Sequence, residues 1–457
     1  MKQLNKTRHH SKSIFRMALC GLILFSAQTA PARQWTLQQC IDYALQNNIT
    51  LLKSRVSHQS AIEDWKQSKA ALLPSLSAST SQNVSYNPWP ETGSYMVAGS
   101  KVQTSVDKVY YNGSYSVTGN WTVWDGHQLR NTVKLNDLTA QQASLDSAVT
   151  ANSIQEQIAQ LYVQILYSKE AIEVNRQTLE VSKKNEERGK EFLKVGSMSK
   201  ADVAQLTAQR AQDEYNVVQA ESNLREYKRQ LKQLLQIIDD EEFDVVAPET
   251  TDAMALADIP SVANVYNAAL SSRPEIKNAM LGLQSSDLQL KIAKAGKLPS
   301  LTMSAGVSTN TTSMSDNAWG TQLKNNFALG GGLTLSIPLF DQRRTKTAVN
   351  KALLQRQTYQ LDLLDKQTTL HSTIENYWLQ ATNNQAQFKS ARVSTESAQT
   401  SYELLSEQFR QNLKNVIELM NGKNTLLQAQ QNELQAKYLT ILNINLLKFY
   451  EDGTLNK

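Results

Sequence analysis

The chain has little cysteine and no long hydrophobic run outside its start. Of its 457 residues only two are cysteine, Cys20 and Cys40. Residues 1–32 predict an export signal, with a basic start, an apolar run too short to span a bilayer, and an Ala30-Pro31-Ala32 cleavage site. Cleavage near Ala32 would leave Cys40 alone, which excludes an intrachain disulfide. No later stretch reaches about 18 apolar residues, so a membrane-spanning helix is not expected either.

Net charge is also lacking once residues 1–32 are set aside. The chain has 47 lysine and arginine residues against 42 aspartate and glutamate residues, a formal net charge of +5. Five of the basic residues and none of the acidic ones lie in residues 1–32, so the remainder is neutral. The apparent basicity therefore belongs to the predicted signal and gives no indication of a nucleic-acid partner.

Proline is absent from two long tracts, residues 91–247 and 339–457. Both are rich in Ala, Leu, Gln, Glu, Lys and Asn and poor in glycine, a composition typical of helices. In the first tract apolar residues recur every seven positions, at Ile158, Ile165, Ile172 and Leu179. This spacing predicts long helices packed as antiparallel coiled-coil hairpins. A continuous helix over residues 126–195 would be roughly 100 Å long at about 1.5 Å per residue.

The chain also contains an internal twofold repeat. KAALLPSLSAS at 69–79 returns as KAGKLPSLTMS at 294–304. Proline disfavours helix in the residue before it, so each copy predicts a joint where a helix ends and a strand begins. Each half then reads as helix, strand, loop, strand, long helix, tip and returning helix. The predicted division is a signal at 1–32, a first repeat at 33–238, a linker at 239–259, a second repeat at 260–450 and a tail at 451–457.

Four strands are expected at about 75–87, 110–124, 300–311 and 327–340, with hairpin tips at about 195–202 and 411–417. Each strand alternates between a small polar face and an apolar face, which is typical of outer-membrane β-barrel strands. Trp121, Trp124 and Phe340 lie where an aromatic girdle at the membrane interface is expected. The polar face is expected to line a lumen and holds Ser75, Ser77, Ser79, Ser81, Asn83, Ser114, Ser116, Thr118, Asn120, Ser300, Thr302 and Ser304.

An ordinary antiparallel sheet with one solvated face is the alternative interpretation of these strands. The absence of charge from the polar faces favours the barrel, because most solvated faces carry charged side chains. Four strands cannot close a barrel, and open strand edges are not tolerated in lipid. The sequence therefore predicts a homo-oligomer whose copies contribute to one barrel.

The doubled layout, the L-P-S-L joints, the IPLFD motif at 337–341 and the tip VGSMSKADV at 195–203 give the chain a specific likeness. Over essentially its whole length after the predicted signal it resembles the TolC-like outer-membrane efflux proteins. The resemblance implies a mainly α fold whose long hairpins form an α-helical barrel, and a homotrimer that shares a twelve-stranded β-barrel in the outer membrane of a Gram-negative bacterium. It also implies a tunnel that extends into the periplasm, docks on a periplasmic adaptor protein and receives substrates from an inner-membrane pump of the RND, ABC or MFS type.

The resemblance further assigns roles to residues at the tips. A pore-narrowing acidic ring of the family aligns with Glu418, and its second acidic position aligns with Asn421, an amide. A basic residue and a tyrosine that tie neighbouring hairpins shut align with Lys414 and Phe409, and their acidic partner aligns with Asp202. Since Phe409 lacks the hydroxyl, an Asp202–Lys414 pair is a substitute tie; the alternative for each charge is a solvated helix terminus. Adaptor docking is expected at Val195, Gly196, Ser197, Asn412 and Leu413.

Motifs for catalysis and for phosphate or metal binding are missing from the sequence. NGKNT at 421–425 lacks the rest of a phosphate loop, and His58, His127 and His371 are scattered, with no HExxH motif or cysteine partner. No enzyme, cofactor or metal is therefore expected. Two functions are left: a channel that passively conducts what a pump exports, and a structural or adhesive coiled-coil protein at the outer membrane without a pore. The uncharged, serine-rich strand faces favour the channel.

Overall fold

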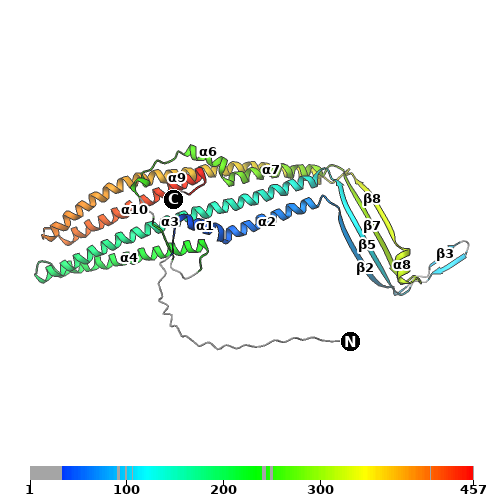
Figure 1. Ribbon diagram of the computed structural model, residues 1–457, viewed down its shortest axis with the longest axis horizontal. Helices are drawn as coiled ribbons and strands as arrows, with labels where there is room; N and C mark the ends of the chain where they lie inside the picture. Colours follow the sequence, from blue (N-terminus) through cyan, green and yellow to red (C-terminus); the bar gives the residue numbers. More distant parts are fainter. Residues whose placement is uncertain are drawn as a thin grey trace, which may run out of the picture.

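A computed structural model describes residues 33–89, 93–97, 100–104, 107–238, 243–247, 251–411 and 413–455. The predicted signal and the tip residue Asn412 lie outside the described residues. The molecule is long and narrow, with a β-sheet at one end and the tips of two helical hairpins at the other (Figure 1).

Two long helices connect the sheet to the tips. They are α3 (Gln128–Lys194) and α9 (Arg344–Arg410), each of 67 residues. Each packs against one shorter helix near the sheet and another near the tip: α2 (Ile49–Ala70) and α4 (Lys200–Leu235) for α3, α7 (Pro274–Ala295) and α10 (Val416–Asp452) for α9 (Figure 1). The predicted mainly helical fold with an internal repeat is confirmed. Within the described part of the chain, none of the helices combines the length and the apolar character needed to cross a membrane.

The sheet has four antiparallel strands in the order β2-β5-β7-β8. They are β2 (Ser75–Tyr86), β5 (Val109–Trp124), β7 (Ser300–Thr312) and β8 (Ala328–Ser336), so that β2 and β8 form the two edges. The last strand ends at Ser336, short of the predicted 340, because Pro338 has no N–H with which to continue the ladder.

Several short elements lie in segments that the sequence left as loops or as the linker. In the linker, β6 (Phe243–Val245) pairs in parallel with β1 (Arg33–Trp35), and α5 (Asp252–Ala255) follows. The antiparallel hairpin of β3 (Gly93–Val97) and β4 (Ser100–Thr104) lies between β2 and β5, and α8 (Trp319–Asn325) lies between β7 and β8. Segments this short carry too few residues for a periodic pattern to reveal them.

The largest hydrophobic core lies midway along the long helices. There α1 (Leu37–Asn47), α6 (Val262–Ser272) and the C-terminal end of α10 pack against α3 and α9. Cys40 is a free thiol in this core, and burial raises its pKa to about 12. The buried guanidinium of Arg273 contacts Glu156 at 3.2 Å and Glu275 at 2.9 Å, and it stacks on Tyr450. This core joins the two halves of the chain between the sheet and the tips.

Candidate functional site

One face of the four-stranded sheet is lined by small polar side chains from edge to edge. The register sets Ser79, Ser116 and Ser308 in one row across three strands. Hydroxyls of neighbouring strands are hydrogen-bonded, at 2.8 Å both for Ser79 with Ser116 and for Ser81 with Ser114. None of the paired residues described on this face is charged. The residues predicted to line a lumen all fall on this face: Ser75, Ser77, Ser79, Ser81, Asn83, Ser114, Ser116, Thr118, Asn120, Ser300, Thr302 and Ser304.

The opposite face is apolar and has aromatic residues at the end nearest the helices. Trp121 lies on it by strict alternation. A β-bulge between Thr122 and Trp124 then sets Trp124 opposite Leu301, which also lies on the apolar face. Without the bulge Trp124 would share the polar face with Thr122, so the bulge puts both tryptophans on one side. Phe340 lies beyond the end of β8 and is 86% exposed.

The two hairpin tips are built alike, from equivalent positions of the two repeats. At the first tip the N–H of Ser197 donates to the backbone oxygen of Phe192 at 2.9 Å; at the second the N–H of Leu413 donates to that of Gln408, also at 2.9 Å. Gly196 has a φ of 77°, a left-handed conformation that favours glycine. Val195 is 76% exposed and Leu413 68% exposed. Each tip therefore presents an apolar side chain to its surroundings.

Charged residues at the tips form hydrogen bonds and ion pairs within their own hairpin. Asp202 accepts from the N–H of Ser199, which caps α4, and Glu418 accepts from the N–H of Asn415, which caps α10. Lys414 forms an ion pair with Glu418 at 2.6 Å. The hydrogen bond from Lys414 lowers the pKa of the Glu418 carboxyl, and the N–H of Asn415 adds to this shift. An Asp202–Lys414 tie between neighbouring hairpins stays a prediction.

Phe409 joins the two hairpins by packing. It is 2% exposed, and its ring lies 6.2 Å from that of Phe192 on α3, measured between centroids. The same cluster includes Leu206 of α4 and both Val416 and Leu419 of α10. Burial of this ring, rather than a hydroxyl contact, links the first hairpin to the second at this level.

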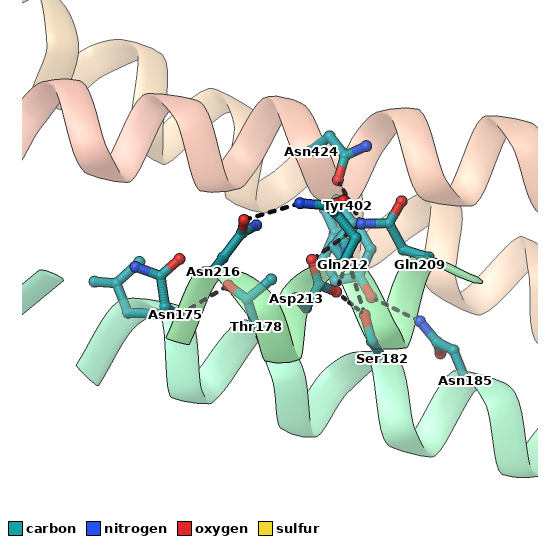
Figure 2. A network of polar contacts seen from close by, with 12 residues as sticks. Asn175, Thr178, Ser182, Asn185, Gln209, Gln212, Asp213, Asn216, Tyr402 and Asn424 are labelled. Carbon is teal, nitrogen blue, oxygen red and sulfur yellow. Dashed lines mark hydrogen bonds and ion pairs between the residues drawn. The ribbon is translucent and has the colours of Figure 1, made fainter. Parts of the chain in front are cut away.

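A buried ionic contact joins the hairpins and was not predicted from the sequence. Lys423 of α10 is 4% exposed and forms an ion pair with Asp213 of α4, which is 2% exposed. Ser182 of α3 donates to the same carboxylate, and Gln209 contacts Asn424 at 3.4 Å (Figure 2). Three helices of two hairpins thus meet at one buried charge pair.

Heptad spacing could have placed each member of this pair on a buried stripe, although it does not specify which residue each one contacts. Lys423 lies between Leu419 and Leu426 on the buried stripe of α10, at positions where an apolar residue is expected. Asp213 follows Leu206 by one heptad on the buried stripe of α4. A charged residue on such a stripe needs a partner of opposite charge, because an unpaired buried charge is costly.

The three histidines that are scattered along the sequence after residue 32 lie on different elements of the structure. His58 lies on α2, His127 just before α3, and His371 on α9. Among the described residues, His, Cys, Asp and Glu side chains do not gather into a group that could hold a metal ion.

A glycine and a leucine allow the helices of each hairpin to approach closely near its tip. A Cβ added at Gly189 of α3 would lie 2.5 Å from Leu206 Cδ1, and one added at Gly422 of α10 would lie 2.6 Å from Leu405 Cδ1. Gly189 and Leu405 occupy equivalent positions of the repeat, as do Leu206 and Gly422. The two hairpins therefore carry the same complementary pair in opposite order.

Replacing Gly189 by valine is expected to destabilise the first hairpin by about 1–3 kcal/mol, because Leu206, which is 3% exposed, must shift within a packed cluster to make room. Amide hydrogen exchange in α4 measures the loss. The exchanged pair Gly189→Leu with Leu206→Gly copies the order of the second hairpin and should recover most of it. Wild-type protection in Gly189→Val alone would show that the close approach is not required.

A comparison with protein families identifies a match over most of the chain. The family model described as outer membrane efflux protein matches residues 40–235 and 265–448, one segment in each repeat. The chain is 21% identical over 406 residues to outer membrane efflux protein BepC of Brucella suis biovar 1 (strain 1330), covering 88% of this chain and 82% of that protein. It is 22% identical over 435 residues to outer membrane protein TolC of Vibrio cholerae serotype O1, covering 92% and 91%.

The fold is shared with solved structures at low sequence identity. The CusC structure, described as showing conformational changes that accompany folding and transmembrane channel formation, superposes with a TM-score of 0.78. The two sequences are 15% identical, and the match covers 93% of each chain. The arrangement of sheet, long helices and paired tips is thus one that other sequences also form.

Proposed function

We propose a transport function for this chain, which belongs to the outer membrane efflux protein family. It passively conducts substrates that an inner-membrane pump delivers, across the periplasm and out of the cell. Members of the family are TolC-like outer membrane efflux channels, which are transporters and not enzymes, and membership implies a trimeric channel. This replaces the alternative of a structural or adhesive coiled-coil protein without a pore.

The observation that carries the proposal is the uncharged polar face of the sheet. A row such as Ser79, Ser116 and Ser308 crosses neighbouring strands without a charged residue, while the other face is apolar. Strands β2 and β8 leave both edges of the four-stranded sheet open. In lipid such edges must pair, and three copies joined edge to edge would make one barrel of twelve strands with the polar face inward.

The tips are the proposed contact surface for a periplasmic adaptor that joins the channel to an RND, ABC or MFS pump. Val195 and Ser197 are exposed beside Gly196 at the first tip, and Leu413 is exposed at the second tip, to whose segment Asn412 also belongs. Apolar residues exposed at a turn are suited to a groove on a partner protein. The equivalent construction of the two tips offers the adaptor two similar surfaces on each copy.

Reconstitution in a planar bilayer tests the channel proposal. Detergent-purified protein should run as a trimer and conduct ions once it is inserted. A monomer that conducts nothing would contradict the proposal. A second check is to add large cations to one side of the bilayer at a time. They should block the ion current more strongly from the side on which the tips lie.

Glu418 is the proposed acidic ring of the aperture, and Glu418→Gln is expected to shift the permeability ratio of cations to anions toward that of a non-selective pore. The Lys414 contact lowers the pKa of Glu418 below the ordinary glutamate value of 4.5. The carboxylate therefore keeps its charge as the pH falls to 4.5, and the cation selectivity should be lost only below that pH. Asn421→Asp is the matched variant, because it adds a second acidic position and should raise cation selectivity. Equal selectivity in wild type and Glu418→Gln would remove Glu418 from the pore.

A further inference from the structure

A basic groove lies where the helices meet the sheet, between the start of α3 and the end of α7. It has a volume of about 790 Å³, and every charged residue of its lining is basic. Residues three or four positions apart share one face of a helix, so both helices present a basic stripe to the groove. These residues are Arg130 and Lys134 on α3, with Lys291, Lys294 and Lys297 on α7 and the turn after it.

These five cations have no ion-pair partner in the part of the chain that the structure describes. All are exposed, and none forms an ion pair with another described residue. The carboxylates that flank them are engaged elsewhere. Asp125 accepts from the N–H of Leu129, Asp137 accepts from the side-chain amide of Gln141, and Asp287 pairs with Arg356 at 2.6 Å. The groove is therefore a concentrated positive site that would attract an anion.

The groove borders the apolar face of the sheet. Its lining includes His127, whose ring meets that of Trp124 edge-on at 6.5 Å between centroids. The bulge in β5 sets Trp124 on the apolar face, opposite Leu301. Leu298, which is 46% exposed, lines the groove just before β7. The basic groove therefore adjoins an apolar surface.

Neighbouring copies of the chain would leave the groove open. Strands β5 and β7 occupy the middle of the sheet, and α3 and α7 pack against each other beside them. The unpaired edges, where another copy would join, are β2 and β8. The groove therefore lies away from the edges at which copies would meet.

We propose that this groove binds the phosphate headgroup of an anionic phospholipid in the periplasmic leaflet of the outer membrane. The inference rests on the proposed function, since it takes the sheet as the membrane-embedded part of the chain. The phosphate supplies the missing counter-charge, while the acyl chains lie along the apolar face beside Leu298 and Leu301. Free phosphate would satisfy the cations but would gain nothing from that surface.

The depth of the cations agrees with the position of a headgroup. The polar zone on one side of a bilayer is roughly 5–8 Å thick. Arg130 lies in the first turn of α3, about 3 Å along the helix axis from Gln128 at about 1.5 Å per residue, and Lys297 lies three residues before the start of β7. Lys134 and Lys291 start deeper in the periplasm, and their long aliphatic stems let the ammonium groups reach back toward the membrane.

Native mass spectrometry of the detergent-purified trimer tests the proposal, with phosphatidylglycerol, phosphatidylcholine and inorganic phosphate as probes. The triple variant Arg130→Gln, Lys294→Gln, Lys297→Gln is expected to bind phosphatidylglycerol roughly 100-fold more weakly than wild type. The matched control Lys200→Gln, Arg225→Gln, Lys389→Gln removes the same kinds of exposed cation from α4 and α9 and should bind as wild type. Lys294→Arg with Lys297→Arg keeps the charge and should also bind as wild type.

Three results would overturn the proposal: wild-type affinity in the triple glutamine variant, equal binding of phosphatidylcholine, or displacement of the lipid by inorganic phosphate at equal concentration. The last would identify a free-anion site instead. Bilayer conductance of the same samples separates the two hypotheses. Normal conductance without lipid selectivity refutes the groove alone, whereas a wild-type protein that does not conduct refutes the channel.

Discussion

Replacing Lys423 by methionine is expected to reduce the free energy that holds the two hairpins together near their tips by about 3–5 kcal/mol. The change leaves the carboxylate of Asp213, which is 2% exposed, without its counter-charge. Burial lowers the pKa of Lys423 from its ordinary value, although Asp213 opposes the shift. The pair therefore gains little over two neutral residues, whereas breaking it is costly. Amide hydrogen exchange over residues 416–429 of the purified trimer measures the loss.

A second variant separates the charge from the packing. Lys423→Met with Asp213→Asn removes both charges and keeps an amide that can still bond Ser182, so most of the protection should return. Lys194→Met is the control, because Lys194 and its partner Glu191 are about equally exposed, at 70% and 68%, and such pairs contribute about 0–1 kcal/mol. If Lys423→Met exchanges no faster than Lys194→Met, the buried pair does not hold the hairpins together.

The joints and the long helices could be predicted because their signals repeat over many residues. The two L-P-S-L segments indicated where helix gives way to strand, and β2 and β7 begin at Ser75 and Ser300, directly after the prolines. The heptads at Ile158–Leu179 likewise indicated α3, and the proline-free composition together with the internal repeat indicated α9. Such patterns remain recognisable when single residues depart from them, because many residues support the same prediction.

The site was predictable only where a local rule decides it. Alternation placed Ser79 and Ser116 on one face, but no pattern indicated the bulge that turns Trp124 to the apolar side. At the tips the resemblance pointed to a contact of Lys414 with Asp202, whereas Lys414 pairs with Glu418, four positions further along the chain. The contact of Lys423 with Asp213 depends on how two hairpins pack, which spacing within one helix does not specify.

Replacing Phe409 by alanine is expected to destabilise the packing of the two hairpins near their tips by about 3–5 kcal/mol, the usual cost of truncating a buried phenylalanine. The ring fills the space between Phe192 and the start of α10, so its loss leaves a cavity between the hairpins. In a planar bilayer the variant should spend more time in states of higher conductance. Leu413→Ala is the control at the same tip, because Leu413 is 68% exposed and its truncation should leave conductance unchanged.

Salt separates closure by Phe409 from closure by ion pairs. Interactions between exposed charges such as Lys414 and Glu418 are screened at high ionic strength, since the Debye length falls to about 3 Å at 1 M. Burial of an aromatic ring is not screened in this way. If Phe409 holds the tips, wild-type channels stay closed at 1 M salt and Phe409→Ala channels open at every ionic strength. If the wild type opens as salt rises while Phe409→Ala behaves like Leu413→Ala, charged ties close the channel, and the aromatic contact only fills space.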